Sequence, residues 1–211
     1  MPNDNSSADS LIIFDFETTG LSPNQGDRTI EIGAVRLEAG QITDRFQALM
    51  NPGMRINSFI EGYTGITNKM LDSAAPCSYV MIEFSRFIGN SNLIAHNASF
   101  DKRFLASEFA RCALTIGGDV GCSLLLAKRI FQDAGSYKLS NLIDYANIEG
   151  AGDYHRALYD AEMTAKLWLS MLGRIRENYD INHIPYHLIK KLTKTPKKAV
   201  ADLLQKMSEE A

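Results

Sequence analysis

Two acidic residues, Asp15 and Glu17, close an apolar segment that begins at Leu11. The branched and aromatic residues of this segment predict a buried strand. Because successive side chains of a strand alternate between its faces, the two carboxylates would project from the same face, about 6.6–6.8 Å apart along the strand. Buried carboxylates are usually paired or bound to a metal. The pair could therefore hold one or two hard cations, or the strand could simply end in a solvated turn.

Further acidic residues and histidines follow in two later segments. Asp101 comes five residues after His96, in the predicted first turn of a helix, where a carboxylate is favourable. Asp160 comes five residues after His155, and positions i and i+5 of a helix lie roughly 140° apart. We therefore expect His155 on the loop that enters the helix, from which it could reach a site lined by Asp160. Taken singly, each of these residues also has an ordinary explanation as a helix cap or a solvated side chain.

Together these side chains suit phosphodiester hydrolysis. Oxygen ligands are preferred by Mg²⁺ and Mn²⁺, and two such ions about 3.5–4 Å apart can stabilise both ends of an in-line displacement. A neutral histidine can accept a proton from water near neutral pH. The sequence has no conspicuous serine or cysteine nucleophile motif, which favours direct attack by water. It also lacks a G-x-x-x-x-G-K-[ST] loop, so ATP hydrolysis has no support.

The three acidic segments occur in an order that resembles the DEDDh 3′→5′ exonucleases, the family that includes the DNA polymerase III epsilon subunit. The resemblance covers roughly residues 10–173, and the combination of segments is highly specific. Tyr63 departs from the histidine that many relatives place before Gly-Ile-Thr, so substrate contacts there are open. The matching stretches are FDFETTG at 14–20, GYTGIT at 62–67, HNASFDKRFL at 96–105 and HRALYDA at 155–161.

This resemblance implies an α/β fold of the ribonuclease H-like kind, with a mixed central sheet flanked by helices. It implies His155 as the general base, and it leaves His96 a structural or supporting role. The implied activity is metal-dependent 3′→5′ hydrolysis of DNA, at single strands or 3′ ends, with release of nucleoside 5′-monophosphates. The implied ligands of two Mg²⁺ or Mn²⁺ ions are Asp15, Glu17, Asp101 and Asp160.

A small polar turn after the first strand could bring the terminal nucleotide close to the metals. Leu21 and Ile66 could wedge or stack on its base, although an ordinary turn and a core isoleucine would look the same. The expected substrate contacts are Thr18, Thr19, Gly20, Leu21 and Ile66. A late basic cluster could also hold the phosphate backbone, unless it is only a solvated helix face. This cluster comprises Lys190, Lys191, Lys194, Lys197 and Lys198.

The motifs leave the substrate and the setting open. The nearest alternative is an exoribonuclease that acts on RNA ends or short oligoribonucleotides. A non-catalytic partner module of a polymerase or repair assembly is a different class, and the intact acids and histidine count against it. Residues 174–211 could bind a polymerase or repair partner, which would allow proofreading. The lack of an extended flexible linker slightly favours a stand-alone enzyme.

The composition is that of one soluble domain of 211 residues with a sizeable core. The formal net charge of −3 becomes about +1 when two divalent ions add +4, so it does not exclude a nucleic-acid partner. There is no run of eighteen apolar residues and no apolar signal segment at the start, which predicts no membrane span and a cytoplasmic location. Reduced thiols are expected because the three cysteines are widely spaced: Cys77, Cys112 and Cys122.

The elements that must position these residues are predicted as strands first and helices later, which favours a three-layer α/β domain. Strands are expected over the Asp15 segment, 29–37, 41–49 and 92–96, the first three antiparallel by their hairpin. Helices are expected from 75–76 to near 89, over 122–131, over 138–146 and from near Arg156 onward. A further helix is expected to begin after Asn97 or Ser99, either of which could be its N-cap. Residues 51–65 are expected to be irregular. The predicted organisation is a disordered leader over 1–9, an exonuclease domain over 10–173 and a C-terminal helical appendage over 174–211.

Overall fold

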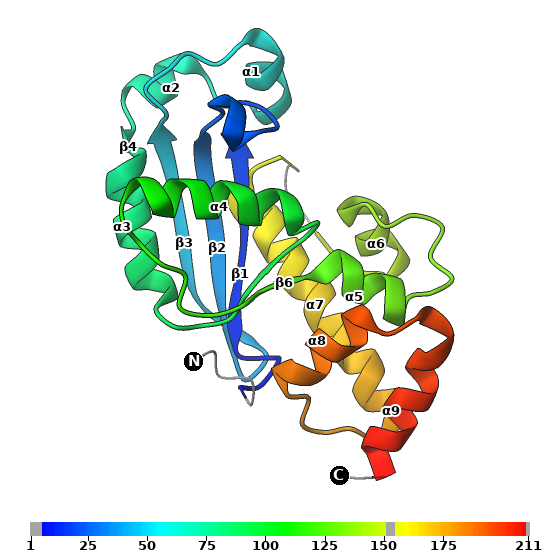
Figure 1. Ribbon diagram of the computed structural model, residues 1–211. Coiled ribbons are helices and arrows are strands. Elements are labelled where there is room, and N and C mark those ends of the chain that lie inside the picture. The colour runs from blue at the N-terminus through cyan, green and yellow to red at the C-terminus, as the bar shows by residue number, and fades with distance from the viewer. Residues whose placement is uncertain (1–5, 151–154, 210–211) are drawn as a thin grey trace.

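The computed structural model describes residues 6–150 and 155–209, and in it a six-stranded sheet lies between two layers of helices (Figure 1). The strand order is β4-β3-β2-β1-β5-β6. The three long strands are antiparallel to one another, whereas the short strands β4, β5 and β6 run parallel to β3, β1 and β5 respectively. The sheet is therefore mixed, as predicted. The strands are β1 (Leu11–Thr18), β2 (Thr29–Glu38), β3 (Gln41–Asn51), β4 (Ala75–Pro76), β5 (Leu93–Ala95) and β6 (Val120–Cys122).

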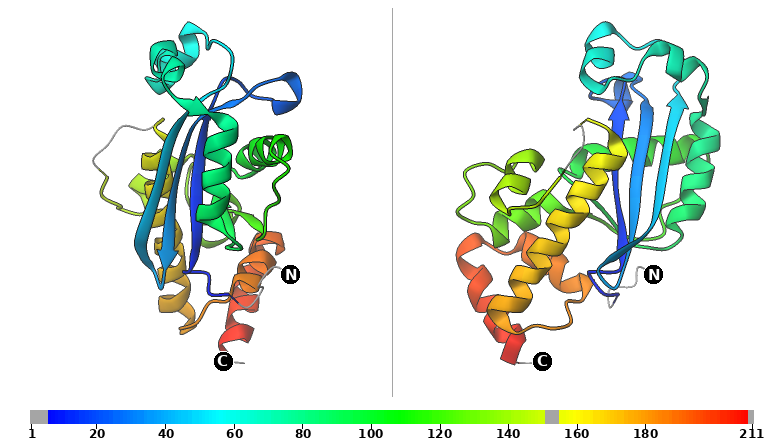
Figure 2. Two further views of the ribbon diagram at one scale, coloured as in Figure 1. Left: turned by 90° about the vertical axis from the view of Figure 1, so that its left-hand side faces the viewer. Right: turned by 180° about the vertical axis from the view of Figure 1, so that it is seen from behind.

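Side chains of β1 alternate between two hydrophobic cores. Leu11 and Ile13 belong to the core that includes α7 (Ala157–Tyr179). Their neighbours Ile12, Phe14 and Phe16 belong to the other core, under α3 (Cys77–Ile88) and α4 (Ser99–Arg111). Figure 2 shows the sheet edge-on, with α3 and α4 on one side and α7 on the other. By this alternation the two acidic residues of β1 continue the stripe that faces α7.

The helix α7 crosses β1 and β2 at close range. A Cβ atom added to Gly33 of β2 would lie 2.0 Å from the backbone nitrogen of Leu158, so only glycine fits there. Gly33 lies opposite Asp15 in the β1–β2 register. The first turn of α7 can therefore rest on the sheet directly beside the acidic end of β1. Further along the helix, the buried Trp168 donates its indole N–H to the carbonyl of Ala8 at 2.7 Å.

Shorter helices complete the two layers, and most lie where the sequence predicts them. One exception is α2 (Asn68–Asp72), a five-residue helix for which the sequence makes no prediction. The other is α1 (Ser58–Thr64), which falls in the stretch 51–65 that the sequence predicts to be irregular. That prediction is wrong: the Asn57 side chain accepts the N–H of Ile60 at 3.0 Å and starts a helix too short to show an apolar period. The other elements are η1 (Pro23–Gln25), α5 (Ser123–Ile130), α6 (Leu139–Tyr145), α8 (Tyr186–Lys194), η2 (Lys197–Ala199) and α9 (Val200–Glu209).

Two local predictions differ from the structure for identifiable reasons. Neither Asn97 nor Ser99 caps α4, since the N-cap position is Ala98 and no side chain bonds there. Asn97 instead adopts a left-handed backbone conformation with φ of 61°, which turns the chain from β5 into α4. The short strands β4 and β6 are absent from the sequence prediction, because two or three residues cannot display an alternating pattern.

The first and the last described segments of the chain both join the main core. Of the predicted leader, residues 1–5 lie outside the described residues, but Ala8 is buried and Asp9 forms an ion pair with Arg176 at 2.6 Å. The predicted boundary at 173 falls inside α7, which continues to Tyr179. The helices α8 and α9 then pack into the same core as α7, so they are not a separate appendage. Within residues 6–150 and 155–209, the helices are too short or too polar to cross a membrane.

Candidate active site

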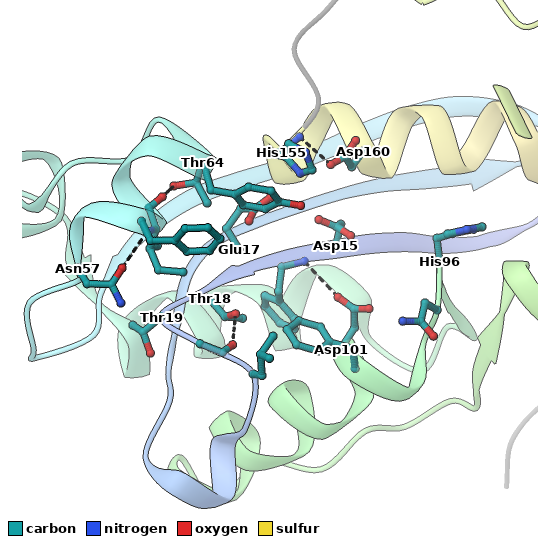
Figure 3. Close-up of a pocket in the computed structure, with 18 residues that line it drawn as sticks. Asp15, Glu17, Thr18, Thr19, Asn57, Thr64, His96, Asp101, His155 and Asp160 are labelled. Atoms are coloured by element: carbon teal, nitrogen blue, oxygen red, sulfur yellow. Dashed lines mark hydrogen bonds between the residues drawn. The ribbon is translucent and has the colours of Figure 1, made fainter. Parts of the chain in front are cut away.

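A cavity of about 670 Å³ opens at the C-terminal end of β1, and it collects the residues of all three acidic segments (Figure 3). Its walls come from β1 and the turn after it, from α1, from the segment between β5 and α4, and from the start of α7. The chain positions that the sequence singled out for chemistry therefore meet in one place. The cavity is lined by Asp15, Glu17, Asp101, His155 and Asp160, among others.

The ends of the strands place the first three carboxylates. Strand β5 pairs with β1 only at Ile12 and Ile13, so the β5-facing edge of β1 is open beyond that point. Asp101 fills this edge from the first turn of α4, where its carboxylate accepts the backbone N–H of Phe16 at 3.3 Å. The N-terminal turn of a helix favours a carboxylate, and so does this hydrogen bond. Asp101 is thereby held beside the carboxylates of β1.

A buried ion pair places the start of α7. Glu31 of β2 is completely buried and lies opposite Glu17 in the β1–β2 register. Its carboxylate accepts from the Arg156 guanidinium at 2.8 and 3.2 Å and from the backbone N–H of Ala157 at 3.1 Å. One carboxylate thus holds both the residue before α7 and its first N–H group. Because Asp160 lies one turn later, this anchor brings it over the acidic end of β1.

His155 lies on the entry to α7, as the sequence predicts. Its backbone has φ of 68°, and its N–H donates to a carboxylate oxygen of Asp160 at 3.0 Å. This bond and the left-handed turn direct the imidazole into the cavity (Figure 3). There the ring packs on Tyr63, with centroids 4.0 Å apart. Residues 151–154 of the preceding loop, from which the histidine is expected to swing, lie outside the described residues.

Burial raises the pKa values of the four carboxylates, and repulsion from neighbouring carboxylates adds to this effect at three of the four. Burial, followed by the charges of Asp160 and Glu31, raises the pKa of Glu17 to about 8. Burial and the surrounding carboxylates, Asp101 first, raise the pKa of Asp15 well above its ordinary value. Burial also raises the pKa of Asp101 to about 7 and raises the pKa of Asp160, although backbone N–H groups act in the opposite direction at both. The crowded site therefore favours protons, or cations that replace them.

The donor set fits divalent cations. Glu17, His155 and Asp160 offer ligand atoms that all lie within 4.8 Å of one another. Among the described residues, Oδ1 of Asp160 is the one buried side-chain oxygen or nitrogen without a hydrogen-bond partner. An unpaired buried carboxylate oxygen that faces other carboxylates is the arrangement that a hard cation completes.

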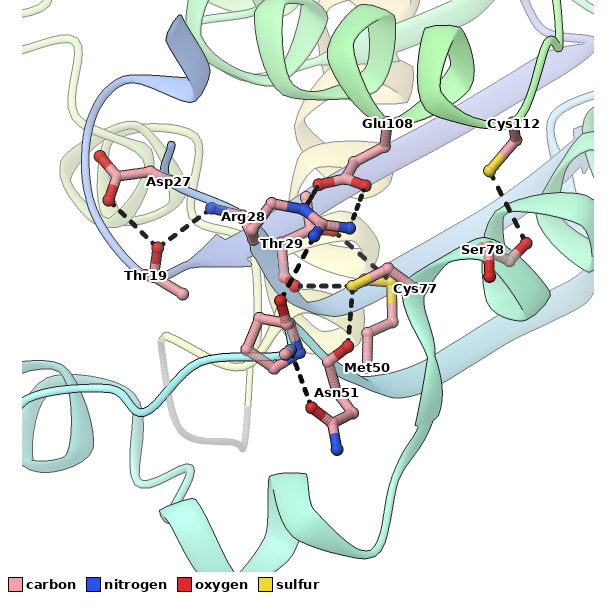
Figure 4. Close-up of polar contacts among 12 residues, drawn as sticks. Thr19, Asp27, Arg28, Thr29, Met50, Asn51, Cys77, Ser78, Glu108 and Cys112 are labelled. Carbon is pink, nitrogen blue, oxygen red and sulfur yellow. Dashed lines mark hydrogen bonds and ion pairs between the residues drawn. The ribbon is translucent and has the colours of Figure 1, made fainter. Parts of the chain in front are cut away.

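The turn after β1 contains the candidate substrate residues, but its threonine hydroxyl groups already form hydrogen bonds within the protein. Thr18 donates its hydroxyl to the carbonyl of Gly20 at 2.6 Å, and Thr19 donates to Asp27 at 3.1 Å. Arg28 then fastens the turn to α4 through two bonds to Glu108, at 2.6 and 2.9 Å (Figure 4). These contacts make the turn a rigid wall of the cavity.

The structure separates the two predicted apolar contacts. Leu21 is 78% exposed and lines the cavity, whereas Ile66 is fully buried in a small core away from the cavity wall. The wedge predicted at Ile66 is therefore wrong, because its side chain packs inward. Sequence reasoning missed Phe59, which is 71% exposed, lines the cavity and stacks on Tyr63 with centroids 5.9 Å apart. This exposed aromatic pair, four positions apart, is hidden in the segment predicted to be irregular.

The predicted basic cluster does not line this cavity. It lies on α8 and the segment after it, and Lys190 forms an ion pair with Asp119 at 2.6 Å. His96 lines the cavity and bonds to Ser123 and to the carbonyl of Tyr137, in keeping with a supporting role. The three cysteines are free thiols.

The raised carboxyl pKa values predict that the metal-free protein loses folding stability as the pH rises. Glu17 ionises near pH 4.5 in the unfolded chain and near pH 8 in the folded one, so its contribution to stability falls as the pH rises through this window. In EDTA, Glu17→Gln should gain stability over the wild type with rising pH, reaching roughly 4 kcal/mol at pH 8. Urea unfolding at pH 5 and pH 8 measures this gain. The exposed Glu38→Gln is the control, and an equal gain at both pH values would contradict the raised pKa.

Comparison with known proteins places this geometry in a family. A model of the exonuclease family, RNase_T, matches residues 12–168. DNA polymerase III PolC-type from Caldanaerobacter subterraneus subsp. tengcongensis is 38% identical over 167 residues, which are 79% of this chain and 12% of that protein. The 3′-5′ exonuclease DinG from Bacillus subtilis is 33% identical over 194 residues, 92% of this chain and 20% of that protein. The chain thus spans a fifth or less of these curated relatives.

A solved structure agrees with these sequence matches. Exonuclease X in complex with 5′ overhanging duplex DNA is 27% identical, with a TM-score of 0.65 over 77% of this chain and 91% of that one. The predicted ribonuclease H-like fold and the resemblance to DEDDh exonucleases are thereby confirmed. The chain belongs to the exonuclease family.

Proposed function

We propose that this chain is a metal-dependent 3′→5′ exonuclease that hydrolyses DNA to nucleoside 5′-monophosphates. The observation that carries the proposal is the meeting of four carboxylates and a histidine, from three separate segments, in one cavity. Family membership supports the reaction class. The choice of DNA is supported by the similarity to a DNA polymerase and to an exonuclease whose structure contains duplex DNA.

The proposed ligands of two Mg²⁺ or Mn²⁺ ions are Asp15, Glu17, Asp101 and Asp160. When bound, such ions supply positive charge to the scissile phosphate and to its attacking and leaving oxygens. The carboxylates act as ligands only after they lose the protons that their raised pKa values favour. Metal binding is therefore coupled to proton release near neutral pH.

His155 is the proposed general base. Its ring faces the cavity beside Glu17 and Asp160, where it can accept a proton from the attacking water. The hydrogen bond from its own N–H to Asp160 fixes its backbone relative to the proposed ligands. Tyr63 packs against one side of the ring and restricts its rotation. These contacts orient the base without occupying the ring nitrogen that must take the proton.

The terminal nucleotide would occupy the exposed half of the cavity. Leu21 and the stacked pair Phe59 and Tyr63 present apolar and aromatic surface there, which suits the face of a base. The tight turn at Thr18–Gly20 lets the nucleotide backbone approach the metals closely, with its hydroxyl groups serving the turn rather than the substrate. Any base contact is therefore expected to be tolerant of sequence.

The setting of the activity is also a proposal. PolC-type relatives are DNA polymerases by name, which supports the association of this chain with a polymerase. Residues 174–211 remain the proposed surface for a polymerase or repair partner. The cytoplasmic location stays a prediction from the sequence.

Digestion of 5′-labelled DNA and RNA of equal sequence, with Mg²⁺, Mn²⁺ or EDTA, tests the proposed reaction. We expect a metal-dependent ladder that shortens from the 3′ end, with DNA preferred. Asp15→Asn should remove it, and His155→Gln should lower kcat by roughly 10²–10⁴-fold with little change in KM. The exposed His183→Gln serves as control. A ladder in EDTA, or no ladder from folded protein with metal, would contradict the proposal, and a preference for RNA would overturn the choice of DNA.

Alanine variants of the exposed cavity residues test the proposed base contacts. Leu21→Ala and Phe59→Ala should each raise KM for a single-stranded oligonucleotide roughly tenfold, because stacking on one base contributes about 1–3 kcal/mol. Values of kcat should change much less. Tyr79→Ala is the matched control, since Tyr79 is an exposed aromatic residue of α3 outside the cavity. Unchanged KM in both cavity variants would rule out the proposed base contact.

A further inference from the structure

A second cavity, of about 720 Å³, adjoins the active site. The two cavities share one wall, formed by Tyr63, His96, Asn97, His155 and Asp160. The opposite wall of the second cavity is residues 136–140, which comprise the end of the loop before α6 and the first two residues of that helix. In Figure 1, α6 lies well to the side of the long strands, next to the first half of α7. A chain that leaves the active site past His155 therefore enters this second cavity.

The stretch 136–140 is fixed to the same segment that carries Asp101. A carbonyl oxygen can only accept, so Nε2 of His96 donates to the carbonyl of Tyr137 at 3.0 Å. The other ring nitrogen then accepts from the hydroxyl of Ser123 at 2.9 Å. The Tyr137 hydroxyl donates in turn to the carbonyl of Phe131 at 2.9 Å. The far wall of the second cavity is thereby held at a set position relative to the acidic site.

Three lysines lie near Tyr137, two of them over its ring and the third next to it in the chain. Lys138 lines the cavity directly. The ammonium groups of Lys128 and Lys197 lie 5.7 and 5.4 Å from the centre of the Tyr137 ring, and the latter is 3.5 Å from the phenol oxygen. In the described part of the chain, the ion pairs involve none of these three lysines. Three cations without carboxylate partners thus converge on one loop, beside a site that is itself rich in carboxylates.

We propose that the second cavity binds the phosphodiester backbone of the substrate strand, on the 5′ side of the terminal nucleotide. In this assignment the phosphates contact Lys138 inside the cavity, and they contact Lys128 and Lys197 where the strand continues past the wall at Tyr137. The proposal rests on the proposed exonuclease function and specifies the path of its substrate. It retains only Lys197 from the basic cluster expected from the sequence.

The charge distribution explains why the strand needs a binding site outside the acidic cavity. We call the proposed phosphate-binding path through the second cavity the track. The acidic site repels a polyanion until cations are bound, so attraction of the strand must come from elsewhere on the surface. Lysines on the far side of a shared wall attract the strand without neutralising the carboxylates. The anchoring of Tyr137 through His96 keeps the two charge clusters apart at a fixed spacing.

Substrates of different length distinguish binding at this track from binding at the terminal site, which is the acidic cavity that holds the 3′-terminal nucleotide. The p-nitrophenyl ester of thymidine 5′-monophosphate reaches only the terminal site, whereas a (dT)20 strand can reach both. The triple variant with Lys128→Ala, Lys138→Ala and Lys197→Ala should raise KM for (dT)20 roughly tenfold more than KM for the ester. The single variant Lys197→Ala should show part of this effect. Lys198→Ala, one residue further along η2 and outside the cation–ring contacts of Tyr137, is the matched control.

Binding measured without catalysis completes the test. In EDTA, fluorescence anisotropy of labelled (dT)20 should give a salt slope that is smaller by about 0.7 for each phosphate that the variant no longer neutralises. An unchanged slope and an unchanged KM ratio in the folded triple variant would overturn the track. Failure of the wild type to hydrolyse the ester with metal would instead contradict the proposed function, while the binding data would still decide the track. If Lys198→Ala weakened (dT)20 binding as much as Lys197→Ala, the effect would reflect only the net charge of the protein, and this result would also overturn the assignment.

Discussion

The site depends on how closely the first turn of α7 approaches the sheet. Gly33 removes the side chain that would block this approach, and Glu31 holds Arg156 and the first N–H of the helix against β2. Both residues lie in β2, opposite the two acidic residues of β1. Without this contact, Asp160 and His155 would have no reason to lie over the acidic end of β1, which is some 140 positions away in the chain.

The same contact imposes an electrostatic cost. It adds Glu31 and Asp160 to a region that already contains the carboxylates of β1 and α4. Burial first, and then repulsion among these carboxylates, raises the pKa values of Asp15 and Glu17. Arg156 offsets this repulsion only in part, because its side chain is 40% exposed while that of its partner Glu31 is fully buried. A fold that tolerates such crowding gives up stability at a functional site. Divalent cations are the partners that would relieve it.

Features that depend on local pattern could be predicted from the sequence, such as the shared face of the two acidic residues in β1. Features that depend on long-range packing could not. Nothing near Ile66 indicates that it points into a core. The polar composition of residues 1–9 favours disorder, yet Ala8 is buried where the distant Trp168 uses its carbonyl as an acceptor. Gly62 and the short length of α1 hide the apolar period of this helix, and for the same reason Phe59 was not recognised as a site residue.

The central claim is that the crowded carboxylates form a site for two divalent cations. Calorimetric titration of the metal-free protein with Mn²⁺ at pH 7, in two buffers of different ionisation enthalpy, tests it most directly. We expect two ions bound per chain, and an apparent heat that differs between the buffers because carboxyl groups in the site release protons as the ions bind. Asp15→Asn should bind fewer ions. Saturation without a buffer-dependent heat, or no saturable binding at all, would contradict this view of the site.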